Sequence, residues 1–127
     1  MSNNKLEDGM ASRWSLSTVC LGGSLQEKFA AMADAGFSRV DLFFEDFTAS
    51  SRSARDVRRM AEDLGLDIVA LLPLRDFEAM GSSRRVLCQQ RADRFLDVAL
   101  ELGTDLIVVC ANTDPDASDD LDEMVSD

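Results

Sequence analysis

Apolar residues follow two different spacings along this chain of 127 residues. In four short stretches they succeed one another with little interruption, which is typical of strands in a buried sheet. In three longer stretches they recur every three or four positions, which predicts helices with one apolar face. The predicted strands are residues 16–21, 39–44, 68–72 and 105–110, and the predicted helices are residues 25–35, 54–64 and 84–102.

The ends of the predicted helices carry recognisable capping residues. Ser24 and Glu27 have the capping-box spacing, in which a hydroxyl and a carboxylate each satisfy a free backbone N–H at the start of the helix. Gly36 stands where a left-handed C-cap would end that helix, and Gly65 and Gly103 follow the other two helices. Strands and helices are therefore predicted to alternate regularly.

A proline and an arginine follow the apolar stretch 68–72. Pro73 predicts the end of this strand, because proline has no N–H to give to a ladder. Arg75 is then expected in the loop at the carboxyl end of the strand, the edge at which parallel α/β folds bind ligands. Arg75 is a candidate binding residue. The alternative is a surface arginine paired with Asp76 or Glu78.

One unit occurs three times in the sequence: the end of a helix, a glycine, a few polar residues and a strand. The copies are DAGFSRVDLFF, DLGLDIVALL and ELGTDLIVVC. Strand–helix alternation with right-handed crossovers gives a parallel sheet. The pattern fits either a small doubly wound sheet or the first half of an eight-stranded barrel. Residues 118–125 begin a further helical pattern that stops early, which favours the truncated barrel.

The predicted fold class is therefore α/β, as the N-terminal half of a (β/α)₈ TIM barrel with about four parallel strands and three to four helices. We expect residues 1–13 to be a disordered lead and residues 14–113 to form the half-barrel. Residues 114–127 are predicted to be an acidic tail that contains the start of a truncated helix.

Charge is distributed unevenly along the chain, whose formal net charge is −11. Residues 111–127 hold seven acids and no base, so residues 1–110 carry −4 (13 minus 17). A solvated acidic tail is the expected reading of that segment. The absence of a basic stripe argues against nucleic-acid binding. No apolar stretch approaches the roughly 20 residues of a membrane span, and the N-terminus has no signal-peptide core. We expect a cytoplasmic protein that binds a small-molecule substrate.

Histidine is absent from the chain, which excludes Ser-His-Asp and Cys-His catalysis and the common zinc sites within it. Cys20, Cys88 and Cys110 are widely spaced and odd in number, so they suggest neither disulfides nor a metal site. Cys20 and Cys110 end apolar stretches and are expected to be buried. Carboxylates, lysine and arginine are the strong chemical groups that remain.

Three further polar residues follow predicted strands at the same edge as Arg75. Glu45 and Asp46 follow the second strand, where they are either solvated loop acids or groups that orient Arg75 or bind a hydroxylated ligand. Asn112 follows the fourth strand and either caps its loop or binds a ligand. Two adjacent acids do not make a metal site, which needs several converging oxygen ligands.

Several segments of the chain are similar to a known superfamily. Over about residues 15–120 the chain resembles the N-terminal half of the sugar phosphate isomerase/epimerase superfamily, the xylose isomerase-like barrels, and within it the 3-dehydroshikimate dehydratases. The segments that carry the resemblance are STVCL with GSL and Lys28, AGF with VDLF, EDF, PLRDFE, and LGTD with VCAN. Phe44 and Leu72 depart from the pattern of that family.

The resemblance implies a metal-dependent lyase of quinate and shikimate degradation, which eliminates water from 3-dehydroshikimate to give protocatechuate. A divalent metal ion (Mg, Mn or Co) would polarise the substrate carbonyl while a base removes the neighbouring proton. Arg75 matches the loop arginine that would meet the substrate carboxylate. The metal ligands of that family come from later strands, so no residue here inherits a metal role and the catalytic residues stay unassigned.

The sequence is also compatible with two alternative functions. The first is a sugar phosphate or inositol isomerase or epimerase of the same superfamily, in which Arg75 would meet a phosphate. The second is a non-catalytic half-barrel. Four strands alone leave two open sheet edges, so we expect the chain by itself to be inactive and to form a homo-oligomer or to pair through these edges.

Overall fold

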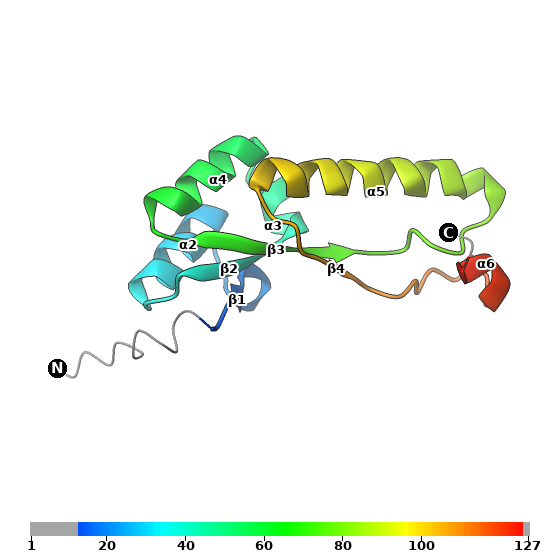
Figure 1. Ribbon diagram of the computed structural model, residues 1–127, viewed down its shortest axis with the longest axis horizontal. Helices are drawn as coiled ribbons and strands as arrows, with labels where there is room; N and C mark the ends of the chain where they lie inside the picture. The colour runs from blue at the N-terminus through cyan, green and yellow to red at the C-terminus, as the bar shows by residue number, and fades with distance from the viewer. Residues whose placement is uncertain (1–12, 126–127) are drawn as a thin grey trace.

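The computed structural model describes residues 13–125 of the chain. Its centre is one parallel sheet in the order β1-β2-β3-β4 (Figure 1). Each strand pairs with its successor in the sequence, as the repeated strand–helix unit predicts. The strands are β1 (Leu16–Ser17), β2 (Arg39–Phe43), β3 (Asp67–Leu74) and β4 (Ile107–Val109).

Helices connect these strands, and α4 and α5 lie along one side of the sheet (Figure 1). The capping box at the start of α2 is confirmed: Ser24 Oγ accepts from the Glu27 N–H at 3.3 Å, and Glu27 Oε2 accepts from the Ser24 N–H at 2.7 Å. Gly36, with a φ of +90°, follows the end of that helix in the left-handed region, as predicted. The helices are α2 (Leu25–Asp34), α3 (Phe44–Ala49), α4 (Ala54–Asp63), α5 (Ser82–Leu102) and α6 (Leu121–Val125).

The first strand is much shorter than the predicted residues 16–21. β1 ends at Ser17, and a 3-10 turn, η1 (Thr18–Cys20), follows it. The Thr18 side chain is fully buried, and its hydroxyl oxygen accepts from the Phe43 N–H at 2.9 Å, in place of a ladder partner. The turn leaves Cys20 exposed, so the prediction that Cys20 is buried is wrong, and Cys110 is only half-buried.

A short helix, α3, replaces the loop predicted at residues 45–47. Glu45 and Asp46 lie in its first turn, where negative charge is favourable beside the free N–H groups of a helix start. Phe47 is buried and packs against Phe44, with ring centroids 5.9 Å apart. Phe47 thus joins this short helix to the core.

The third strand continues through Pro73 to Leu74, although proline was predicted to stop it. The pairing of β3 with β4 shifts register between Leu71 and Leu74. Pro73 therefore lies in an irregular part of the ladder, where a missing N–H costs little. Arg75 is still the first residue beyond the strand, as predicted.

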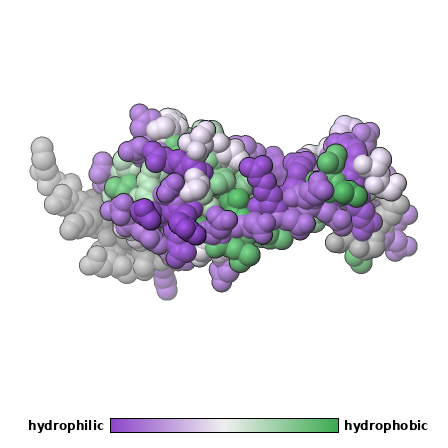
Figure 2. Space-filling view, turned by 90° about the horizontal axis from the view of Figure 1, so that it is seen from above, coloured by the Kyte–Doolittle hydropathy of each residue, from purple (hydrophilic) through white to green (hydrophobic). Residues whose placement is uncertain are grey.

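The core lies between the sheet and the helices. It contains apolar residues of α2, α4 and α5 that recur at helical spacing, and Cys88 of α5 is also buried. Seen from above, hydrophilic side chains cover most of the molecule, and apolar surface shows in patches (Figure 2). Fully or almost fully buried are Phe29, Met32, Val40, Leu42, Val57, Ala61, Leu71, Phe95 and Leu102.

The fourth strand is shorter than the predicted residues 105–110 and is not buried. Val108 and Val109 are 41% and 50% exposed, because β4 is an edge of the sheet and the described residues place no fifth strand beside it. β1 forms the other edge. Between residues 13 and 125, no helix has the length and apolar character needed to cross a membrane. The predicted lead 1–13 lies almost wholly outside the described residues.

Candidate functional site

A cavity of about 400 Å³ lies where β3 ends, between α3 and α5. Arg75 lines it from the residue after β3, and Glu45 lines it from the first turn of α3. The structure therefore brings these two predicted residues to one place, although they are far apart in the sequence. Its apolar wall includes Phe44 and Phe95, whose ring centroids are 5.0 Å apart.

Two arginines of α5 line the same cavity, and sequence reasoning did not single them out. Arg91 and Arg94 are three residues apart, which places them on the same face of a helix. Phe95, directly after Arg94, is 2% exposed and anchors this part of α5 on the core. In the sequence, two arginines at helical spacing beside an aromatic residue of the predicted apolar face could have indicated them.

Asp46 does not share this cavity with Glu45. Both of its carboxylate oxygens accept hydrogen bonds from Lys28 Nζ, each at 2.9 Å. The side chains of Lys28 and Asp46 are only 7% and 19% exposed, so the ion pair joins α2 to α3 away from bulk water. Asp46 is therefore a structural partner of Lys28 rather than a solvated loop acid, and a role of Asp46 toward Arg75 or a ligand stays a prediction.

Asn112 is held in a second set of contacts, between the loops that follow β3 and β4. Its Nδ2 donates to the backbone oxygen of Glu78 at 2.5 Å and contacts Met80 Sδ at 3.1 Å. Its Oδ1 accepts from the Asp114 N–H at 2.8 Å, and its own N–H donates to Glu78 Oε1. The side-chain amide thus fixes the loop, which is the simpler of its two predicted roles.

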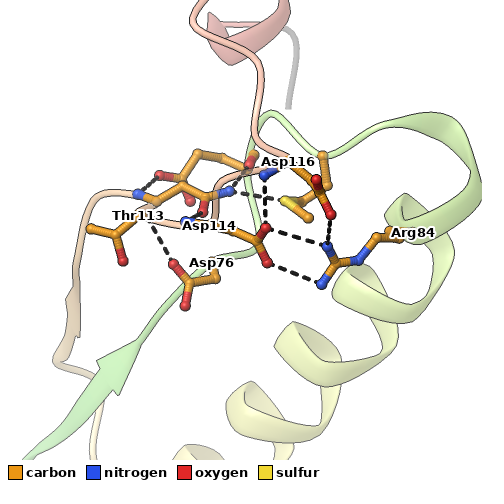
Figure 3. Close-up of polar contacts among 8 residues, drawn as sticks. Asp76, Arg84, Thr113, Asp114 and Asp116 are labelled. Carbon is orange, nitrogen blue, oxygen red and sulfur yellow. Dashed lines mark hydrogen bonds and ion pairs between the residues drawn. The ribbon is translucent and has the colours of Figure 1, made fainter.

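The start of the acidic segment is tied to the body of the protein rather than solvated throughout (Figure 3). Arg84 of α5 donates to Asp114 Oδ2 at 3.0 Å and to Asp116 Oδ2 at 2.9 Å. The Thr113 N–H donates to Asp76 Oδ1 at 3.0 Å. These contacts hold the loop after β4 against the residues that directly follow Arg75.

Charge and hydrogen bonding shift two ionisation equilibria in this loop. The N–H of Asp116 donates to the Asp114 carboxylate and lowers the pKa of Asp114, and Arg84 adds to the effect. The same pairing with Asp114 raises the pKa of Arg84. Both shifts favour the charged pair.

Arg75 differs from Arg84 in its surroundings. Within residues 13–125, no carboxylate lies within ion-pair distance of Arg75, although Glu45 and Asp76 line the same cavity. The predicted alternative, a pair with Asp76 or Glu78, is not formed among these residues. Asp76 Oδ1 instead accepts from the Thr113 N–H, and Glu78 Oε1 accepts from the Asn112 N–H. The guanidinium is available to an anion that enters the cavity.

The described residues contain no candidate metal centre. Across the part of the chain that the structure describes, no three His, Cys, Asp or Glu side chains come together in a cluster able to hold a cation. One oxygen of Glu78, Oε2, is buried without a hydrogen-bond partner among these residues. A single carboxylate oxygen is not a metal site.

Comparison with known proteins identifies relatives along most of the chain. No family model matches. The chain is 47% identical over 103 residues to a 3-dehydroshikimate dehydratase of Pseudomonas aeruginosa, and 43% identical over 113 residues to one of Pseudomonas putida. These matches cover 81% and 89% of this chain, but only 16% and 18% of the relatives.

A solved structure shows the same fold. The chain superposes with a TM-score of 0.81 on a xylose isomerase-like TIM barrel/4-hydroxyphenylpyruvate dioxygenase fusion protein. The two are 43% identical, and the match covers 89% of this chain and 18% of that one. The resemblance predicted from the sequence is confirmed, and the four parallel strands in sequence order are the N-terminal half of a (β/α)₈ barrel.

Proposed function

We propose that this chain is the N-terminal part of a 3-dehydroshikimate dehydratase, a lyase that eliminates water from a cyclic hydroxy-ketone carboxylate, and that Arg75 binds the substrate carboxylate. One observation carries the proposal. Arg75 lies directly past β3, lines a cavity and has no carboxylate partner among the described residues, in a chain 47% identical over 103 residues to a protein of that name.

The chemistry assigned to these residues is binding and orientation. A guanidinium can hold a carboxylate with two parallel hydrogen bonds, which fixes the substrate in direction as well as position. Glu45, which also lines the cavity, would orient Arg75 or accept from a substrate hydroxyl. Elimination also needs a base to remove the proton beside the carbonyl, and that base is not assigned to this chain.

The resemblance also implies a divalent metal ion, which would polarise the substrate carbonyl when bound. The described residues do not fit this group, since they bring no cluster of three acidic, cysteine or histidine side chains together. The proposal places the metal ligands on later strands of the barrel, so the chain alone is expected to be inactive.

A chimeric enzyme tests the role of Arg75. The matching stretch of the *Pseudomonas putida* relative is replaced by this chain, and protocatechuate formed from 3-dehydroshikimate is measured. Arg75→Ala should lower kcat/KM roughly a hundredfold, because a paired, charged hydrogen-bond contact contributes about 3 kcal/mol. Arg55→Ala, at an exposed arginine of α4, is the matched control and should leave kcat/KM unchanged.

Unchanged kinetics in the Arg75→Ala chimera would remove Arg75 from the site. Turnover of phosphosugars without turnover of 3-dehydroshikimate would instead select the sugar phosphate isomerase or epimerase, with Arg75 on a phosphate. The two reactions share the barrel and the arginine, and they differ in the anion that the arginine meets.

The two open edges of the sheet, β1 and β4, need partner strands. We propose that later strands of the same barrel cover β1 and β4, because an unpaired strand edge otherwise invites association. The intact mass of the protein from its native source tests this. A mass well above 13.9 kDa supports covering strands in the same polypeptide, and a mass near 13.9 kDa would favour pairing with a second chain.

A further inference from the structure

We propose that Arg91 and Arg94 of α5 complete, together with Arg75, a binding site for a small carboxylate that carries an apolar or ring-shaped body. The site is the cavity between α3, the end of β3 and α5. The inference deepens the proposed function, on which its biological meaning rests, because it adds two residues to the site of Arg75. Its test measures binding alone.

The three arginines come from two different elements and converge on one hollow. Arg75 enters at the carboxyl end of β3, while Arg91 and Arg94 enter from the middle of α5, on one face of that helix. The buried Phe95 holds the helix against the core, and its ring contacts Phe44 of α3. The backbone positions of the arginines are thus set by packing, which lowers the cost of arranging them around a ligand.

The charges around this cavity are unbalanced. None of the three guanidiniums forms an ion pair within residues 13–125, whereas Arg58 and Arg84 are each bound to a carboxylate. Glu45 and Asp76 also line the cavity, so its side chains sum to +1 (three arginines minus two acids), in a chain whose net charge is −11. A bound monoanion would relieve the mutual repulsion of the arginines.

The walls of the cavity select among anions. Phe44, Pro73, Leu74 and Phe95 give it an apolar lining beside the charged side chains. A pocket of this kind buries the body of a ligand against apolar side chains and fixes its orientation by a few polar groups. A free phosphate would use the arginines only, whereas a ring carboxylate would use both surfaces. The geometry therefore favours the ring carboxylate.

Benzoate is a suitable probe, because it joins a carboxylate to a flat apolar ring and needs no catalysis. Its affinity for the 127-residue chain is measured by NMR titration of backbone amides. Arg91→Ala/Arg94→Ala should weaken binding about tenfold or more, as expected when charged hydrogen bonds are removed. Arg55→Ala on α4 is the matched control, and its affinity should equal that of the unaltered chain.

Three comparisons decide the outcome. Benzyl alcohol, which lacks the charge, should bind at least about tenfold more weakly than benzoate. Arg91→Lys/Arg94→Lys should restore part of the affinity, since lysine keeps the charge but not the planar pair of donors. Equal affinity for benzoate in the double alanine variant, with unchanged unfolding by urea, would overturn the inference. Inorganic phosphate bound as tightly as benzoate would overturn the choice of a ring carboxylate.

Failure of this inference is distinguishable from failure of the proposed function. Loss of benzoate binding in the double alanine variant, together with a chimera that cannot dehydrate 3-dehydroshikimate, would support the carboxylate site and refute the dehydratase. The other outcome is an active chimera, with kcat/KM and benzoate affinity both unchanged by Arg91→Ala/Arg94→Ala. That result would support the dehydratase and refute the role assigned to these two arginines.

Discussion

Arg84, in the first turns of α5, and Asp114, in the loop after β4, meet with Nη2 and Oδ2 3.0 Å apart (Figure 3). Arg84 also reaches Asp116, at 2.9 Å. The pair joins the connections that follow two neighbouring strands, at the edge of the sheet where Arg75 emerges. It therefore constrains the loop surroundings of the candidate site.

Replacing Arg84 by alanine should free the loop after β4 without unfolding the protein. The Arg84 side chain is 47% exposed, and exposed ion pairs add little to global stability. Hydrogen exchange should become faster at the amides of Asp114 and Asp116, while the urea midpoint changes little. The control is Arg58→Ala, which removes the exposed pair with Glu62 on α4. Unchanged exchange after Arg84→Ala would show that the other contacts suffice.

The loop should lose order in acid through Asp114. The pKa of Asp114 lies below its ordinary value of 3.8, because the Asp116 N–H and Arg84 favour the carboxylate. Because this pKa is lower in the folded than in the unfolded state, the carboxylate stabilises the fold fully above the unfolded pKa. That stabilisation is lost as the pH falls through the folded pKa. The Asp116 amide resonance should therefore hold steady above about pH 4 and titrate below it.

Asp114→Asn tests this assignment, because an amide does not titrate. The low-pH change at the Asp116 amide should disappear in that variant. Asp119→Asn, at an exposed acid of the same segment, is the control and should leave the change in place. A transition that persists in Asp114→Asn would assign it to another group.

Removing only one partner of the Lys28–Asp46 ion pair should lower the free energy of unfolding more than removing both partners. Lys28→Met leaves the Asp46 carboxylate with little water and no partner, which should lower the free energy of unfolding by about 3 kcal/mol. Lys28→Met/Asp46→Leu should be less damaging than the single change, because both charges are then absent. Urea unfolding measures both, and equal losses in the two variants would show that packing around Lys28, rather than charge, is decisive.

The buried hydroxyl of Thr18 should stabilise the end of β2. Thr18→Val keeps the shape of the side chain but removes the acceptor for the Phe43 N–H, which should cost about 1–3 kcal/mol in urea unfolding. Thr18→Ser keeps the acceptor and loses only a methyl group, so it should cost less. A larger loss in Thr18→Ser would mean that the methyl group matters more than the hydrogen bond.

Local sequence patterns were sufficient for the parts of the fold that depend on near neighbours. Helical spacing predicted helices with one apolar face, and the buried residues of α2, α4 and α5 recur at that spacing, although Leu64 after α4 is 39% exposed. The capping box of Ser24 and Glu27 appears as predicted. The predicted end of β3 at Pro73 was wrong, because the register of the neighbouring strand decides whether a missing N–H matters. The length of β1 depended likewise on the contact between Thr18 and Phe43.

The candidate site was only partly predictable. Sequence placed Arg75, Glu45, Asp46 and Asn112 at one edge of the sheet, but it could not say which way each would turn. Successive residues of a helix point about 100° apart, and once α3 forms, Glu45 lines the cavity whereas Asp46 is paired with Lys28 of α2.

By itself, the sequence determined the alternation of strands and helices, the faces that are buried and the place of Arg75 after a strand. These features follow from propensities and periodicities within a few residues. Tertiary structure alone decided that Asp46 binds Lys28, that Asn112 holds Glu78, and that Arg91 and Arg94 face the cavity of Arg75. Such contacts join side chains on different elements, so they exist only once the helices are packed on the sheet.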